Sequence, residues 1–138
     1  MSQIPRFQAV VIPILRASPA LAGVKIGSWI EDIDHRLFPM INIRRVGGVR
    51  HETRPNELDK ATMEMTAYTS EGLIETEQLY IEALEVLYEA VEQQTQTDAG
   101  YLHSIKETFG MTQFSSLFMD SWRVQGLIAL GVRPPRSP

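Results

Sequence analysis

The chain has 138 residues and a formal net charge of −4. This length fits one domain with a sizeable core. The absence of cysteine excludes disulfides, thiolate nucleophiles and cysteine-bound metals. The acidic balance argues against a dedicated nucleic-acid binder, and no apolar run reaches the roughly 20 residues of a membrane helix. The N-terminus MSQIPRFQ carries no signal-peptide pattern, so we expect a protein of the reducing cytoplasm, or of an assembly that starts there, without a membrane partner.

The first expected element is a short amphipathic helix at residues 5–16. Apolar side chains recur there at helical spacing and give the segment one buried face. They are Phe7, Val10, Val11, Ile14 and Leu15. Pro13 removes one helical hydrogen bond, so we expect a kink or an early end at that position.

Three segments then alternate apolar and polar residues, the pattern of strands with one buried and one solvated face. They are VKIGSWIE at residues 24–31, FPMINIRRV at 38–46 and KATMEMTA at 60–67. Gly47 and Gly48 follow the second segment and can adopt positive φ at little cost. This pair is therefore predicted to close a hairpin.

Residues 71–94 carry the clearest pattern, that of a long amphipathic helix. Its apolar stripe is of the kind that packs on a sheet and consists of Leu73, Ile74, Tyr80, Ile81, Leu84, Leu87, Tyr88 and Val91. Further strands are predicted at residues 101–109 and 122–132. The order α-β-β-β-α-β-β favours an α+β fold, with a mixed, mostly antiparallel sheet and helices packed on one face. One domain is expected over residues 1–133, followed by a flexible tail at 134–138.

A basic segment stands out against the acidic whole. The stretch INIRRVGGVRHETRP, residues 41–55, places Arg44, Arg45, Arg50 and Arg54 around Gly47 and Gly48. Successive side chains of a strand point to opposite faces, so Arg44 and Arg45 cannot both line one nucleic-acid groove. No aromatic residue is interleaved with these arginines, as a single-strand binder would need. Because arginine pairs bidentately with carboxylates, protein carboxylates are the favoured partner.

Matching carboxylates lie on the long helix. Six glutamates and a glutamine recur every three or four residues, with no lysine or arginine among them: Glu71, Glu75, Gln78, Glu82, Glu85, Glu89 and Glu92. This face either keeps the protein soluble, or meets a basic partner, or lines a channel that repels an anionic polymer. Arginines and glutamates so separated indicate a self-complementary, head-to-tail interface that closes into a ring when the rotation allows. We place Glu82, Glu85 and Glu89 at this interface.

The segment GMTQFSSLFMD, residues 110–120, lacks the period of a strand although it is partly apolar. One interpretation is a loop folded over the edge of the core. The other is an apolar interaction patch that includes Phe114 and Phe118.

Enzyme chemistry finds little support in the sequence. The cluster EDIDH, residues 31–35, could bind a metal but lacks the spacing of a calcium loop, and a solvated loop explains it as well. His35, His51 and His103 are scattered, and VGGVR lacks the GK[ST] ending of a phosphate loop. We therefore expect no catalytic site, no metal and no cofactor.

Several of these segments together resemble a known family. They are the apolar strand that enters RRVGG, the downstream TRP, the alternating strand that precedes the long helix, and the final strand that ends in VRP. Over nearly the whole chain this arrangement is similar to the tail terminator proteins of siphophages, particularly those of phages that infect actinobacteria. Other head-tail connection proteins share the design of a sheet with helices and are an alternative, as is a nucleic-acid-binding module that uses the segment from Arg44 to Arg54.

The resemblance implies a structural virion protein without enzymatic activity. Such a protein forms a ring, expected to be hexameric, at the head-proximal end of the tail tube. There it stops tube polymerisation and joins the tube to the head connector. The implied partners are other copies of the chain, the tail tube protein and the head-tail connector protein, while genomic DNA passes through the lumen without specific binding. Gly47, Gly48 and the neighbouring arginines would then lie near adjacent subunits or the tube.

Overall fold

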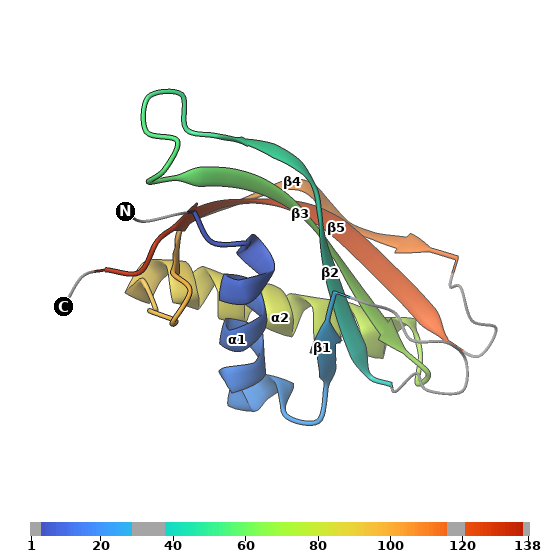
Figure 1. Ribbon diagram of the computed structural model, residues 1–138. Helices are drawn as coiled ribbons and strands as arrows, with labels where there is room; N and C mark the ends of the chain where they lie inside the picture. Colours follow the sequence, from blue (N-terminus) through green and yellow to red (C-terminus); the bar gives the residue numbers. More distant parts are fainter. Residues whose placement is uncertain (1–3, 29–37, 116–120, 137–138) are drawn as a thin grey trace.

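The computed structural model describes residues 4–28, 38–115 and 121–136. Two α-helices and a five-stranded mixed sheet form an α+β fold (Figure 1), which confirms the predicted class and order of elements. The elements are α1 (Phe7–Ala17), a 3-10 turn η1 (Pro19–Leu21), β1 (Lys25–Gly27), β2 (Met40–Arg50), β3 (Asp59–Thr69), α2 (Leu73–Gln93), β4 (Tyr101–Phe114) and β5 (Trp122–Arg133).

The strands lie in the order β1-β2-β3-β5-β4. Only the short β1 is parallel to its neighbour, and all other pairings are antiparallel. β3 pairs with β5 without a register shift from Asp59 opposite Val132 to Thr69 opposite Trp122. Among the described strands, β4 pairs with β5 only. β2 pairs with β3 along its length, but its other side pairs with β1 only as far as Asn42. The sheet therefore has two free edges.

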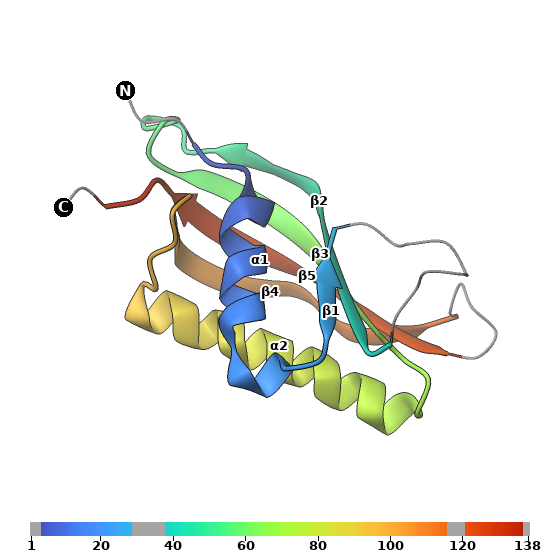
Figure 2. The same cartoon turned by 60° about the horizontal axis from the view of Figure 1, so that its bottom comes forward.

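Both helices lie on one face of the sheet (Figure 2). α2 runs along β3, β5 and β4, while α1 packs against α2 and the β1 side of the sheet. The core between the layers includes Met63, Met65 and Ile128 from the strands, with Tyr80 and Leu87 from α2. In β3 these inward residues alternate with Lys60, Thr62 and Glu64, the period that predicted the strand.

The helix expected at residues 5–16 is present as α1, and it continues past Pro13 to Ala17 instead of ending early there. The glycine pair differs from the prediction. Gly47 and Gly48 do not close a hairpin; they lie inside β2, where the register with β3 shifts between Arg45 and Gly47. Gly48 has φ +103°, and a Cβ there would overlap the backbone of Lys60 and Ala61. The glycine pair therefore permits a β-bulge at close approach of two strands, and the chain reverses only after Arg50.

The segment at residues 110–114 was expected outside a strand, and this was wrong. β4 continues without interruption from Tyr101 to Phe114. Its register with β5 shifts between Leu102 and Ser104, between Glu107 and Phe109, and between Phe109 and Thr112. Each shift breaks the alternation of faces, so the sequence shows no strand period there. Residues 116–120, which include Phe118, lie outside the described residues, as do residues 29–31 of the first predicted strand.

A close contact between α2 and the sheet generates a prediction. Gly126 of β5 faces the Tyr80 hydroxyl, and an alanine Cβ at this position would overlap that oxygen and the Phe109 carbonyl. The Tyr80 hydroxyl is buried without a hydrogen-bond partner among the described residues, and burial raises its pKa to about 12. Gly126→Ala should lower the free energy of unfolding by about 1–3 kcal/mol because it overpacks the core.

Urea denaturation of Gly126→Ala, Tyr80→Phe and the double variant checks this contact. Tyr80→Phe alone should be nearly neutral, because it removes an unpaired buried hydroxyl. In the double variant the loss should be smaller than in Gly126→Ala, since one overlapping atom is gone. Equal losses with and without the hydroxyl would show that the helix does not approach the sheet as described.

Candidate assembly interface

The two neighbouring arginines of β2 lie on opposite faces of the sheet, as predicted. Arg44 is on the face without helices, where its guanidinium donates to both carboxylate oxygens of Glu64, each at 3.1 Å. Arg45 is on the helix face and donates to both oxygens of Asp59, at 2.5 and 3.0 Å. In both cases the hydrogen bond to the carboxylate raises the pKa of the arginine above its usual value.

The two ion pairs differ in burial, and this sets their roles. The Arg44 side chain is 62% exposed, so solvent screens its pair with Glu64. The Asp59 side chain is only 4% exposed, and Arg45 covers it. A carboxylate so buried needs its partner, because an uncompensated buried charge is costly. Arg45 therefore stabilises the folded chain by neutralising the buried Asp59 carboxylate.

Arg50 and Arg54 are the more accessible members of the basic segment. Arg50 ends β2, is exposed, and has no ion-pair partner among the described residues. Arg54 lies in the connection between β2 and β3, where it reaches Glu57 at 3.4 Å with a side chain 72% exposed. Both arginine side chains are therefore accessible to solvent.

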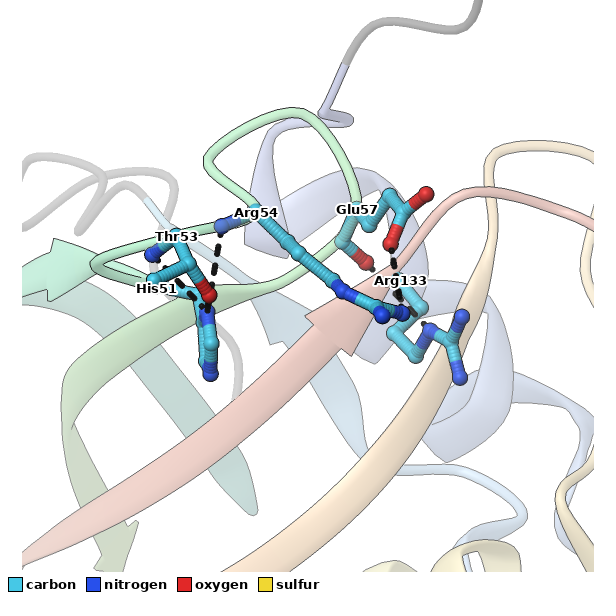
Figure 3. Close-up of polar contacts among 5 residues, drawn as sticks. All are labelled: His51, Thr53, Arg54, Glu57 and Arg133. Carbon is cyan, nitrogen blue, oxygen red and sulfur yellow. Dashed lines mark hydrogen bonds and ion pairs between the residues drawn. The ribbon is translucent and has the colours of Figure 1, made fainter.

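The connection at residues 51–58 has a defined shape (Figure 3). Nδ1 of His51 accepts hydrogen bonds from the backbone N–H groups of Thr53 and Arg54, at 3.3 and 3.2 Å. Nε of Arg133, at the end of β5, donates to the Glu57 carbonyl at 3.3 Å. This turn, rather than the Gly47–Gly48 pair, closes the β2–β3 hairpin and holds Arg54 at one end of the sheet.

The predicted acidic surface exists on α2. Glu82, Glu85 and Glu89 are exposed, and none of them has an ion-pair partner among the described residues. From Leu73 to Gln93 the helix carries six glutamates and no lysine or arginine. The arginines of the basic segment pair with Glu64, Asp59 and Glu57 instead, so the structure does not bring them and the α2 glutamates together within one chain.

Charge is also divided between the two sides of the molecule. The elements on the β2 side, α1 to β2, carry only basic charge in their described residues: Arg6, Arg16, Lys25, Arg44, Arg45 and Arg50. α2 carries only acidic charge. The formal net charge of −4 hides this separation, because the opposite charges sum within one chain.

Three residues predicted in the buried stripe of α2 are exposed instead. Ile74, Ile81 and Tyr88 are 67%, 46% and 38% exposed. The buried face is formed by Thr76, Leu79, Tyr80, Ala83, Leu87 and Ala90. These three residues are seven positions apart and therefore lie in one line along the helix. The sequence shows this spacing, but the prediction grouped them with the buried residues in one broad apolar stripe.

Phe114, predicted as part of an apolar interaction patch, lies on the face of the sheet without helices. Phe114 is partly exposed, and the Arg123 guanidinium lies 5.1 Å from its ring centre. With Phe109 and Leu127 it borders a shallow hollow of about 220 Å³. Phe109, 52% exposed, was not singled out from the sequence, because the bulges of β4 hide its place in a strand.

Within the described parts of the chain, no three histidine, aspartate or glutamate side chains gather as metal ligands would. The EDIDH cluster at residues 31–35 lies outside the described residues. No helix in these parts is long and apolar enough to cross a membrane.

The unequal burial of the two ion pairs gives a prediction. Arg45→Met should lower the free energy of unfolding by about 2–4 kcal/mol, because it leaves the buried Asp59 carboxylate without a partner. Arg44→Met is the matched control and should cost less than about 1 kcal/mol, since its pair is exposed. Denaturant titration of both variants measures the difference; equal losses would contradict the structural role of Arg45.

Comparison with known proteins places this α+β chain in a family. The chain matches the family described as phage tail termination protein over residues 3–138. It is 61% identical over 137 residues to the Gene 22 protein of Mycobacterium phage L5 and 62% identical to that of Mycobacterium phage D29, with 99% of each chain covered in both cases.

A solved structure shares the fold. It is a chain from the virion of a native gene transfer agent particle, with a TM-score of 0.60 and 15% identity, over 91% of this chain and 93% of that one. At 15% identity this likeness shows the fold alone, whereas the family match and the two relatives, at 61% and 62% identity, also show the family. The chain therefore belongs to the family of phage tail termination proteins and is a structural protein of the virion tail.

Proposed function

We propose that this protein forms a closed ring, hexameric by the resemblance noted above, at the head-proximal end of the tail tube. The ring caps the tube, stops its polymerisation and joins it to the head connector. The observation that carries the proposal is the division of charge: the described residues of α1, β1 and β2 carry only basic charge, and α2 carries only acidic charge. Each copy thus offers two complementary surfaces, as a head-to-tail contact requires.

The free sheet edges support the same arrangement. β2 beyond Asn42 and the whole of β4 have unpaired backbone N–H and C=O groups on one side, among the described strands. Such edges are templates for pairing with another chain. They lie on opposite sides of the sheet, so the β2 edge of one copy can meet the β4 edge of the next. Arg50 and Arg54 would then approach the β4 side of a neighbour, where Glu85 of α2 and Glu107 of β4 lie near Tyr88. Glu82 and Glu89 lie toward η1 and α1 instead.

The alternative functions have weaker support. A nucleic-acid module would use Arg44 to Arg54 together, but Arg44 and Arg45 point to opposite faces and each already binds a carboxylate. Another head-tail connection protein would share the ring and the charge division. It would differ in its neighbours, because a terminator contacts the end of the tail tube directly.

Reversing two accessible arginines tests the proposed ring. Arg50→Glu combined with Arg54→Glu should abolish ring assembly on the tail tube protein, because like charges then face each other across the contact. Lys60→Glu, which reverses a charge on the face of β3 without helices and away from both free edges, is the control. Native mass spectrometry and electron microscopy measure the rings, and circular dichroism confirms folding.

The wild-type chain must be tested with the tail tube protein present, because a terminator can require the tube end for assembly. Rings of the wild type and of the lysine variant, together with monomers of the arginine variant, are the expected result. A wild-type chain that stays monomeric beside assembled tubes would refute the ring. Rings that survive the arginine reversal would remove these residues from the interface.

A further inference from the structure

The two free edges of the sheet each carry a large exposed apolar side chain. Val49 of β2 is 68% exposed, and Phe109 of β4 is 52% exposed. Val49 lies in the part of β2 that pairs with β3 alone among the described strands, and β4 pairs with β5 alone. An exposed edge with apolar residues is a template for another strand. Each edge therefore offers unpaired backbone groups and an apolar contact together.

Val49 and its neighbour Arg50 point to opposite faces of the sheet. Val49 is opposite Lys60 of β3, on the face without helices. Arg50 is opposite Asp59, whose side chain is covered by Arg45 on the helix face. Arg50 is exposed and has no ion-pair partner among the described residues. The end of β2 thus presents a positive charge on one face and an apolar side chain on the other.

β4 carries a matching pair of residues, because a bulge interrupts it. Glu107 is opposite the core residue Ile128 and accepts a hydrogen bond from the Tyr88 hydroxyl of α2 at 3.0 Å, so it lies on the helix face. Phe109 is opposite Leu127 and borders the hollow on the face without helices. Residues two apart in a regular strand share a face, but the register shift between Glu107 and Phe109 places them on opposite faces.

The directions of the strands allow these two edges to pair. β2, β3, β5 and β4 are each antiparallel to the next, so β2 and β4 run in opposite directions. Copies related by rotation about a ring axis keep these directions, so β4 of one copy meets β2 of the next as an antiparallel pair. Directly opposite residues of such a pair lie on the same face. A joined sheet therefore sets helix-face residues of one edge against helix-face residues of the other.

We infer that neighbouring copies in the ring join β2 to β4 at the register that sets Arg50 opposite Glu107 and Val49 opposite Phe109. Thr108 is then the extra residue of the bulge, as it is toward β5. The inference rests on the proposed ring and specifies its lateral contact. The partner at each edge is another copy of this chain, because this register pairs arginine with carboxylate on the helix face and two apolar side chains on the other face.

The register also agrees with closure of a ring. Within one copy Arg50 is level with Leu102 of β4, through Asp59 and Val132. In the inferred contact it is level with Glu107, five residues further along β4. This offset is about 17 Å, and the four strands from one junction to the next span about 19 Å. Equivalent residues stay at one height in a ring when the strands tilt by about 40°, which is within the range of closed β-barrels.

Disulfide formation between engineered cysteines tests the register, and the chain has no cysteine of its own. Val49→Cys and Phe109→Cys are made separately and together, assembled with the tail tube protein and oxidised mildly. Cα atoms of directly opposite residues lie about 4.5–5.5 Å apart, a distance that a disulfide spans. The double variant should give a ladder of covalent oligomers on a non-reducing denaturing gel. A mixture of the single variants should give dimers with one of each, and each single variant alone should stay monomeric.

A control pair and the rings themselves separate the two proposals. Phe114 lies on the same face of β4 as Phe109, but four positions of β5, about 14 Å, further along. Val49→Cys with Phe114→Cys should therefore give no ladder. Rings of the Val49→Cys, Phe109→Cys variant without a ladder, or an equal ladder from the control pair, would overturn the register and leave the ring standing. Absence of wild-type rings beside assembled tubes would overturn the ring and the register together.

An exchange of charges tests the helix-face half of the register. Arg50→Glu and Glu107→Arg should each lower the assembled fraction about tenfold or more, because like charges then face each other across the contact. The two combined should restore assembly, since the ion pair is present again with its signs exchanged. Arg50→Glu with Glu89→Arg is the matched control and should not recover, because Glu89 lies toward α1. In variants that circular dichroism shows to be folded, failure of the exchanged pair to recover beside wild-type rings would overturn the pairing.

Discussion

The unbroken pairing of β3 with β5 is the interaction on which the rest of the molecule depends. It runs from Asp59 to Thr69 without a bulge, so the alternation of faces stays in phase along the centre of the sheet. One set of side chains, including Met63 and Met65, receives the helices. The flanking strands are less regular: β2 has one register shift and β4 has three. Irregularity is thus confined to the strands that form the free edges.

The same division separates residues that support the fold from residues that are available for contacts. Arg45 reaches inward and covers the buried Asp59, whereas Arg44, one residue earlier, lies in solvent with Glu64. Arg50 is the last residue of β2, after the bulge, and Arg54 lies in the connection that follows the strand. A basic segment that looks uniform in sequence therefore contains one arginine that covers a buried carboxylate and three whose side chains remain exposed.

The sequence predicted the elements well where one face is buried and the chain is regular. The period of two in residues 60–67 and the period of 3.6 in residues 71–94 both follow from burial against a single opposite layer. The prediction failed where a strand contains a bulge. Gly48 was assigned to a turn, because a glycine with positive φ is found in turns and in bulges alike. In residues 110–114 the bulges of β4 interrupt the alternation of faces that would have indicated a strand. The predicted burial of Ile81 was also wrong, because a 21-residue helix can place only part of a broad apolar stripe against a sheet of this width.

A head-to-tail contact has a consequence for how such a protein can act as a stop. In the proposed contact every copy uses both a basic and an acidic side, so an open row of copies would always end in one free side of each kind. Only closure leaves no such end. In the proposed ring, closure also pairs the β2 and β4 edges, which would otherwise remain templates for further strands. A closed ring then has no lateral surface left for addition of another copy, and any further partner must bind along the ring axis. Separation of charge and free edges on opposite sides of one small domain would thus be the physical basis both for assembly and for its end.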